Sequence, residues 1–179
     1  MQVETASTER LDLVWLSPAA LEGLLDGRRS DVEQLGGFAL PDDWPNEHDR
    51  RFLAYRQRQI SKDPGEARWL VRAIVLRDEA RPMIGHIGFH GSPGRNSRSD
   101  PQAVEVGYTI FEPYRRRGYA TEAVRALMGW AEGEGIDRFV ASIAPDNVPS
   151  LALVGKLGFR EVGRHWDDED GEELEFELP

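Results

Sequence analysis

The alternation of apolar and polar residues divides the chain into short strands and amphipathic helices. Residues 10–16 alternate with a period of two, which predicts a half-buried strand. Behind Tyr119, apolar residues recur every three or four positions and predict one helix that ends at Gly133-Glu134-Gly135. The predicted elements are, in order, a strand at 10–16, helices at 18–26 and 46–62 with a further turn at 31–37 between them, a hairpin of 68–77 and 83–90, a strand at 104–110, the helix behind Tyr119, a strand at 139–143, a helix from 147 to 158, and a hairpin of 160–166 and 173–178.

The order of these elements predicts how the sheet is built. Residues 139–143 form an apolar run, which is typical of a strand buried on both faces. Because this strand follows strand 104–110 through a helix, we expect the two strands to be parallel, with room for a ligand at their carboxyl ends. The alternation in the last strand predicts three inward and three outward side chains, namely Leu174, Phe176 and Leu178 facing the core and Glu173, Glu175 and Glu177 facing out.

The turn after strand 104–110 carries three consecutive arginines and then Gly118. A helix start leaves its first N–H groups unpaired and carries partial positive charge, so phosphate oxygens are favoured there. Gly118 permits close approach of the backbone, and the arginines add attraction and bidentate contacts. Gly107, inside the strand, marks a bulge or the close approach of another backbone or a ligand. A solvated basic turn is the alternative, but the order of strand, basic glycine loop and helix favours phosphate binding.

Composition narrows the class of protein. A chain of 179 residues with 40% hydrophobic and 30% charged residues fits one globular domain over 1–179. A net charge of −10 argues against general nucleic-acid binding and makes a cationic or amine substrate easier to attract. The absence of cysteine excludes disulfides and a cysteine nucleophile. Because no apolar run approaches the roughly 20 residues of a membrane span and no signal peptide is indicated, we expect a cytoplasmic protein.

Two histidines on strand 83–90 share a face but are unsuited to a metal site. His86 and His90 are four residues apart, and four strand residues span about 13 Å. That distance is too long for two ligands of one metal, so we expect no metal.

Three short motifs together resemble the GNAT superfamily of N-acetyltransferases. Arg115-Arg116-Arg117-Gly118-Tyr119-Ala120 is similar to the Q/R-x-x-G-x-G/A pyrophosphate loop of that family. Asn147-x-x-Ser150 and Lys156-Leu157-Gly158-Phe159 resemble the branch of ribosomal-protein N-terminal acetyltransferases of the RimJ/RimL type. The likeness covers about 103–162, whereas the earlier residues match in layout only. It implies an α/β (α+β) three-layer fold, with a central mixed sheet of about six to seven strands splayed between two parallel strands and helices on both faces.

The resemblance also implies acetyl-CoA as cosubstrate and a set of residues that hold it. The pantetheine arm is expected to lie against strand 104–110, with the pyrophosphate on the basic loop. Asn147 is equally explained as a helix cap and Lys156 as a cation at a helix C-terminus. The expected coenzyme A contacts are Ile110, Arg115, Arg116, Arg117, Gly118, Tyr119, Ala120, Thr121, Asn147 and Lys156.

Two residues are candidates for catalysis. Glu105 lies two residues before Gly107 on the same side of the strand, where related enzymes often place a carboxylate that accepts a proton directly or through water. A charged residue at the exposed end of a strand is the alternative. The tyrosine that many relatives use to donate to the leaving thiolate is replaced by Val154, and Ser150 is the neighbouring candidate. Its alternative role is to satisfy free N–H groups of the helix start.

The implied reaction is transfer of an acetyl group from acetyl-CoA to a primary amine, by direct attack in a ternary complex. The acceptor is a small molecule or a peptide N-terminus, and the protein is a monomer or a homodimer. The alternative is a catalytically weak module that binds acyl-CoA and recognises a protein partner. A nucleotide-binding domain is poorly supported, because the chain has neither a G-x-G-x-x-G after its first strand nor a G-K-[ST] motif.

Overall fold

The structure is a computed structural model, and it describes residues 5–167 and 171–178. The described chain forms two compact units, one made of residues up to Gly88 with Tyr108–Leu127 and the other of Phe89–Gly107 with the residues from Met128 onward. That the chain is one domain over 1–179 stays a prediction. The elements are β1 (Ala6–Ser7), β2 (Leu11–Trp15), α1 (Pro18–Leu25), α2 (Arg29–Gly36), α3 (Glu47–Lys62), the 3₁₀ helix η1 (Pro64–Arg68), β3 (Arg72–Leu76), β4 (Met83–Phe89), β5 (Ala103–Ile110), the 3₁₀ helix η2 (Glu112–Tyr114), α4 (Tyr119–Gly133), β6 (Arg138–Ile143), α5 (Val148–Leu157), β7 (Arg160–Asp167) and β8 (Gly171–Leu178).

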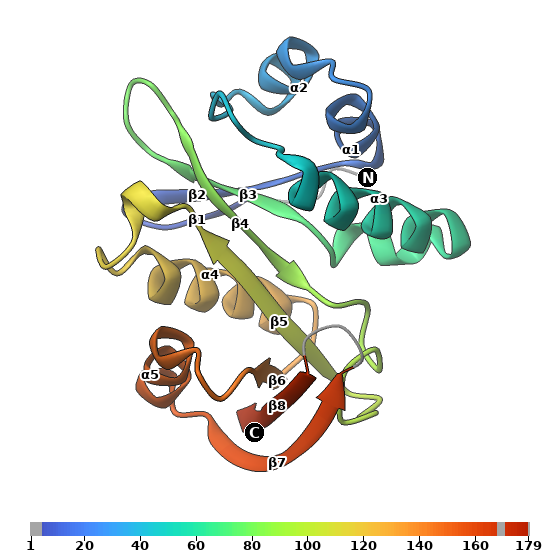
Figure 1. Ribbon diagram of the computed structural model, residues 1–179, viewed down its shortest axis with the longest axis vertical. Coiled ribbons are helices and arrows are strands. Elements are labelled where there is room, and N and C mark those ends of the chain that lie inside the picture. The colour runs from blue at the N-terminus through green and yellow to red at the C-terminus, as the bar shows by residue number, and fades with distance from the viewer. Residues whose placement is uncertain (1–4, 168–170, 179) are drawn as a thin grey trace. The chain divides into compact units, whose positions relative to one another are not determined.

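The strands form one open mixed sheet in the order β1-β2-β3-β4-β5-β6-β8-β7, and the described residues contain five α-helices (Figure 1). The predicted mixed α/β fold is therefore confirmed, with eight strands in place of six or seven. The strand that the sequence analysis missed is β1, which pairs with β2 through Ala6↔Leu13 and Ser7↔Asp12. A strand of two residues is too short for an alternating pattern to reveal it.

In the first unit, α1, α2 and α3 gather on one side of β2 and β3 (Figure 1). Ser17 caps α1 by accepting a hydrogen bond from the N–H of Ala20, and Asn46 and Asp49 form a reciprocal capping box at the start of α3. Side chains from these helices pack with Ala73 and Val75 of β3 in one apolar cluster. Burial of this face holds the helices on the sheet.

One predicted strand begins later than expected. Residues 68–77 were predicted as a strand, but the strand starts at Arg72 because η1 occupies Pro64–Arg68. The turn chemistry of Asp63 explains the difference, since its side chain accepts a hydrogen bond from the N–H of Gly65 and holds the chain in a tight turn. The predicted turn at 31–37 is longer than expected and forms α2, which ends at Gly37 with φ of 65°.

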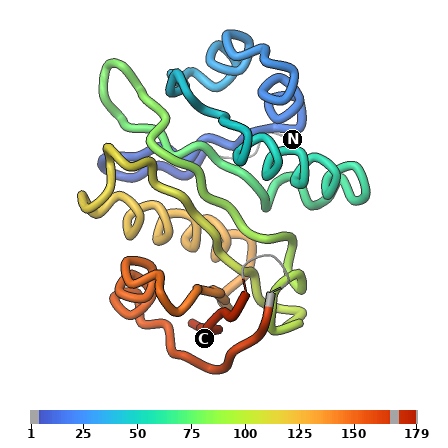
Figure 2. The backbone as a smooth tube through the Cα atoms, in the orientation of Figure 1, coloured from blue at the N-terminus to red at the C-terminus, as the bar shows by residue number. Residues whose placement is uncertain are grey.

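β4 and β5 form a long hairpin, visible in Figure 2 as the chain runs out along β4 and returns along β5. The N–H of Phe111 donates to the carbonyl of Ile84, and the N–H of His90 donates to that of Glu105. On its other edge β5 is parallel to β6, as predicted, but the register stops at Glu105↔Val140. β5 itself continues to Ile110 and β6 to Ile143, so the paired register covers only the first part of each strand.

In the second unit, β6 and β7 flank β8, and both pairs are antiparallel. The predicted last hairpin is present, although its turn at 168–170 lies outside the described residues. The solvent exposure expected for the outward face is wrong at Glu175, since this residue is only 5% exposed. Arg98 and His165 lie beside its carboxylate, so this face of β8 is covered by polar side chains.

Candidate functional site

The basic loop joins the end of β5 to the start of α4. Arg116 and Gly118 have φ angles of 61° and 81°, so the chain turns twice through the left-handed region before Tyr119 opens the helix. Residues 115–118 are exposed, and 119–121 are half-buried. The first N–H groups of a helix have no partner within it, so this turn presents a surface of backbone donors. A left-handed φ suits glycine at 118 and disfavours a branched side chain there.

Side chains on both sides support this loop. The Nε of Arg115 donates to the carbonyl of Ile110 at 2.9 Å, which ties the loop back to the end of β5. The Nη1 of Arg10 donates to the carbonyl of Arg117 at 3.2 Å, and its guanidinium lies over the ring of Tyr119, 4.6 Å from the centroid. Sequence reasoning missed Arg10, because it precedes β2 and nothing in the local pattern connects it to residues 107 positions away.

Glu122, in the first turn of α4, holds Arg10 in place. Its Oε2 accepts a hydrogen bond from the Nε of Arg10 at 2.7 Å, and its Oε1 accepts one from the hydroxyl of Thr8 at 2.6 Å. Burial alone would raise the pKa of the Glu122 carboxyl, but the hydrogen bonds from Thr8 and Arg10 outweigh it and lower that pKa. The carboxylate is therefore ionised at neutral pH and positions Arg10 beside the loop.

The loop has the features of an anion-binding site. It combines an exposed helix N-terminus, left-handed turns at Arg116 and Gly118, and guanidinium groups from Arg10 and the three loop arginines. These are the donors that a doubly charged phosphate group requires. No group of three or more His, Asp or Glu residues that could hold a metal ion occurs in the described part of the chain.

Glu105 lies in the second unit and is nearly enclosed. The residue is 3% exposed, so the alternative of a charge at an exposed strand end is wrong. Its Oε2 accepts a hydrogen bond from the backbone N–H of Ser97 at 2.6 Å, and its Oε1 lies 3.5 Å from the Nδ1 of His90. The loop at 91–102 thus packs against β5 and supplies one contact to this carboxylate, while the residue after β4 supplies the other.

The imidazole of His90 lies against Gly107. A Cβ built on Gly107 would lie 2.9 Å from the Nε2 of His90, closer than real contacts of this kind. The sequence predicted that Gly107 marks the approach of another backbone or a ligand. The structure places a side chain there instead, on the same face of the sheet as Glu105.

The start of α5 carries the other predicted residues of the second unit. Asn147 is the N-cap, and its Oδ1 accepts a hydrogen bond from the N–H of Ser150 at 3.3 Å. Ser150 is half-buried in the first turn. Lys156 is exposed in the last turn, just before Gly158, whose φ of 89° ends the helix. Asn147 therefore acts as a helix cap, and Lys156 is a cation at a helix C-terminus. Contacts of these two residues with coenzyme A stay predictions.

His86, on β4, lies among three aromatic rings of the first unit. It stacks on Phe52 with ring centroids 5.1 Å apart, and Trp44 and Phe111 lie at 6.3 and 6.4 Å. Burial lowers the pKa of His86 to about 4, with smaller contributions from the charges of Arg56 and His48. The imidazole is neutral at pH 7.

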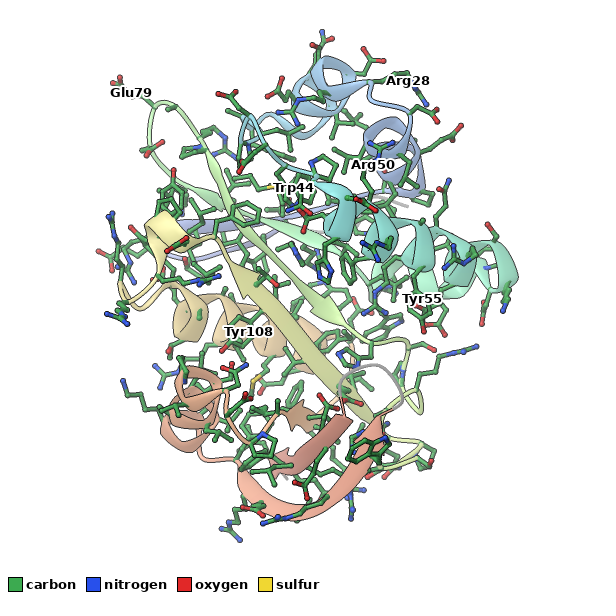
Figure 3. The ribbon with its side chains drawn as sticks, viewed as in Figure 1. Arg28, Trp44, Arg50, Tyr55, Glu79 and Tyr108 are labelled. Carbon is green, nitrogen blue, oxygen red and sulfur yellow. The ribbon has the colours of Figure 1, made fainter. Side chains whose placement is uncertain are left out.

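Two aromatic residues of the first unit differ in exposure. Trp44 is buried at 3% exposure, whereas Tyr55 is 55% exposed on α3 (Figure 3).

A hollow of about 510 Å³ opens beside α2 in the first unit, and none of its lining residues is a predicted site residue. Arg29, within it, donates to the carbonyl oxygens of Trp44 and Pro41, which gives this arginine a structural role. The lining residues are Gly27, Arg28, Arg29, Ser30, Asp31, Glu33, Leu40 and Asp42.

The predicted site residues thus fall into two groups. Ile110 and Arg115–Thr121 belong to the first unit, where the structure brings the loop, the end of β5 and Arg10 together. Glu105, Asn147, Ser150 and Lys156 belong to the second unit. There, Glu105 contacts Ser97 and His90, and Asn147 contacts Ser150.

None of the helices among the described residues combines the length and apolarity needed to cross a membrane.

Comparison with known proteins adds independent information. The profile of the acetyltransferase (GNAT) domain family matches residues 10–160. An uncharacterized N-acetyltransferase of Bacillus subtilis, YjdG, is 28% identical over 153 residues, which cover 85% of this chain and 87% of the relative.

Two solved structures have the same fold. A GNAT-family acetyltransferase from Bacillus anthracis is 21% identical, with a TM-score of 0.63 over 98% of both chains. RimL, the ribosomal L7/L12 α-N-protein acetyltransferase, solved with coenzyme A, is 18% identical, with a TM-score of 0.61 over 98% of this chain and 97% of RimL.

Proposed function

The chain belongs to the GNAT family of acetyltransferases, and we propose that it transfers an acetyl group from acetyl-CoA to a primary amine by direct attack in a ternary complex. The observation that carries this proposal is the exposed double left-handed turn at Arg116 and Gly118, which opens α4 directly after β5. Acetyl-CoA supplies the activated acetyl group when it is bound. Residues of the chain itself bind acetyl-CoA, accept the proton of the amine and stabilise the departing thiolate in this proposal.

Binding falls mainly to backbone groups. The N–H groups from Arg117 to Thr121 hold the pyrophosphate, with Arg115, Arg116 and Arg10 adding charge around it. Ile110 offers its backbone beyond the last residue of β5 that pairs with β6, so in this proposal the pantetheine arm adds there as a strand would. Asn147 and Lys156, at the two ends of α5, complete the proposed contacts.

Catalysis requires removal of a proton from the amine and stabilisation of the departing thiolate. We assign the first task to the carboxylate of Glu105, acting directly or through water, and the second to the hydroxyl of Ser150. The contacts of Glu105 support this role, since the Ser97 N–H at 2.6 Å and the His90 imidazole at 3.5 Å hold its carboxylate in one position.

The acceptor in this proposal is a small-molecule amine or a protein N-terminus. RimL acts on the N-terminus of a ribosomal protein, and its fold matches this chain along nearly its whole length. The net charge of −10 supports attraction of a cationic acceptor. Either acceptor class presents the same primary amine to the thioester.

The test is release of free coenzyme A from acetyl-CoA in the presence of spermine, glycinamide or a peptide with a free serine N-terminus. A thiol-reactive dye reports this release without background, because the chain has no cysteine. We expect amine-dependent thiol release and a mass increase of one acetyl group on the acceptor. Stabilisation by acetyl-CoA without turnover of any amine would refute transfer and favour a binding module that recognises a protein partner.

A further inference from the structure

Arg10 contacts three consecutive residues of the turn that opens α4. Its Nη1 donates to the carbonyl of Arg117 at 3.2 Å. A Cβ built on Gly118 would lie 3.5 Å from its Nη2, so the guanidinium lies beside the backbone of that residue. The guanidinium also lies over the ring of Tyr119, 4.6 Å from the centroid. All of these residues belong to the first unit.

Glu122 holds the same guanidinium from α4. Its Oε2 lies 2.7 Å from the Nε of Arg10 and 2.5 Å from the Nη2, so two donors of the guanidinium meet one charged oxygen. Its Oε1 accepts hydrogen bonds from the backbone N–H of Arg10 at 3.1 Å and from the hydroxyl of Thr8 at 2.6 Å. Both carboxylate oxygens therefore bind Arg10, which leaves this side chain little freedom to turn away from the loop.

The peptide between Arg117 and Gly118 is the part of the loop that this contact orients. A peptide bond is planar and trans, so its C=O and N–H point in opposite directions. Because Arg10 binds the carbonyl of Arg117, the N–H of Gly118 points away from the guanidinium. Glycine adopts both signs of φ with similar ease, so Gly118 alone does not select its φ of 81°. Selection of this orientation therefore falls to contacts from outside the turn, such as that of Arg10.

The charge of Arg10 does not by itself explain its placement. A carboxylate oxygen at 2.5 Å offsets much of the positive charge that Arg10 brings near the loop. The same carboxylate would repel a phosphate group bound at this helix start. A side chain that only attracted phosphate would be better without such a partner. A side chain that holds a carbonyl in one orientation, by contrast, benefits from being held itself.

We propose that Arg10 is a positioning residue for coenzyme A binding, and that Glu122 holds it in this role. By fixing the carbonyl of Arg117, it directs the N–H of Gly118 at the pyrophosphate. This inference rests on the proposed function, which assigns the pyrophosphate to the N–H groups from Arg117 to Thr121. In addition to the charge that it adds, Arg10 thus acts through the backbone of the loop. The loop is then arranged before the ligand binds, which reduces the entropy lost on binding.

Calorimetry of coenzyme A binding separates this role from a role of charge. We expect Arg10→Ala to lower the affinity about tenfold, which corresponds to about 1.4 kcal/mol. Arg10→Lys keeps the charge but loses the planar guanidinium, so it should lower the affinity nearly as much. Arg125→Ala, at an exposed arginine of α4, is the matched control and should keep the affinity of the parent. Parent-like affinity in Arg10→Lys would overturn the proposal, because charge would then be sufficient.

Glu122→Gln distinguishes the two roles by the sign of its effect. The substitution removes a negative charge beside the loop, so an Arg10 that acted through charge alone would give tighter binding of coenzyme A. A positioning role predicts binding that is weaker by about threefold or more, because a neutral amide holds a guanidinium less firmly than a carboxylate does. In acetylation assays of this variant, KM for acetyl-CoA should rise more than kcat falls. Tighter or unchanged binding of coenzyme A would overturn the proposal.

Nitrogen relaxation of the backbone N–H groups, measured without ligand, tests the contact itself. At residues 117–119 we expect order parameters of about 0.85 in the parent and below about 0.6 in Arg10→Ala and Arg10→Lys. Residues 124–131 of α4 should stay at about 0.85 in all three proteins, which also shows that each variant is folded. If Arg10→Ala is not folded, Arg10→Lys carries the comparison.

Equal order parameters at 117–119 in the parent and the folded Arg10 variants would overturn the proposal, even if the parent binds coenzyme A. A parent that binds no coenzyme A would refute the proposed function instead. Lower order parameters in the variants would then still show that Arg10 holds the loop.

Discussion

The loop 115–118 keeps its polar groups exposed, whereas the carboxylate of Glu105 is enclosed by a backbone N–H and an imidazole. The arrangement of the loop depends on its backbone conformation, because Gly118 turns the chain through the left-handed region just before α4 begins. The surroundings of Glu105 depend on contacts between separate segments of the chain, namely Ser97 in the loop 91–102 and His90 after β4. A local motif can specify the first kind of region, while only the fold specifies the second.

This contrast predicts different sensitivities to mutation. In the loop, the conformation of one glycine should matter more than any one charge, because the donors are backbone groups. Around Glu105 and on β8, loss of one partner leaves another buried polar group unsatisfied, so single charges should matter there. The following predictions test that difference, from the largest expected effect to the smallest.

Gly118→Val should give the largest effect. Valine at φ of 81° is strained, and its side chain would block the approach of a phosphate to the N–H groups behind it. We expect affinity for coenzyme A to fall about a hundredfold or more, close to 3 kcal/mol, as measured by calorimetry. Arg116→Ala is the matched variant and should cost less than tenfold. Equal affinities for Gly118→Val and the parent would refute the loop assignment.

His86 should make stability depend on pH. Its folded pKa of about 4 is below the value near 6.5 expected when unfolded, so the unfolded chain takes up the proton first as pH falls. This contribution to stability is complete above pH 6.5 and is lost progressively towards pH 4. Between pH 7 and pH 4.5 the parent should lose about 2.5 kcal/mol more than His86→Phe does.

Urea unfolding at both pH values measures this difference. Carboxylates titrate in the same range, so only the difference between parent and variant reports on His86. Arg58→Gln, at an exposed residue of α3 that does not contribute to the shift of His86, is the control and should keep the pH dependence of the parent. Identical pH dependence in the parent and His86→Phe would show that the imidazole is not held neutral.

Local spacing accounts for much of the fold but for only part of the candidate site. The apolar stripe of α4, the cap at Asn147 and the turn at Gly118 each lie within a few residues of what they determine. The contact of Arg10 with the loop joins residues 107 positions apart, and that of Arg98 with Glu175 joins residues 77 apart. Neither the periodicity of apolar residues nor a short sequence motif can predict such pairs, because the two residues come together only when the chain has folded.

Glu175→Gln tests whether these unpredicted contacts stabilise the second unit. The carboxylate of Glu175 accepts a hydrogen bond from Nη1 of Arg98 at 3.1 Å, whereas Arg98 keeps a second partner in Glu177 at 2.9 Å. We expect a loss of about 2 kcal/mol in the free energy of unfolding, below the value for a pair with no other partner. Glu177→Gln, at a more exposed carboxylate, should cost less than 1 kcal/mol. Equal losses of unfolding free energy in the two variants would contradict the idea that the more buried carboxylate contributes more to stability.

Ser150→Ala should give the smallest effect, and on rate alone. The hydrogen bond that starts α5 runs from the backbone N–H of Ser150 to Asn147, so alanine at 150 preserves it. The start of α5 and the affinity for coenzyme A should therefore stay close to those of the parent. If the hydroxyl donates to the developing thiolate, kcat should fall about tenfold, which corresponds to about 1.4 kcal/mol.

Asn147→Ala is the comparison that isolates the cap at this helix start. It removes the side chain that accepts the Ser150 N–H, so it should lower stability by about 1 kcal/mol. A Ser150→Ala variant with lower stability and unchanged kcat would reduce Ser150 to a structural residue of the first turn. The thiolate would then take its hydrogen bond from water, since no tyrosine follows Tyr119 in the chain.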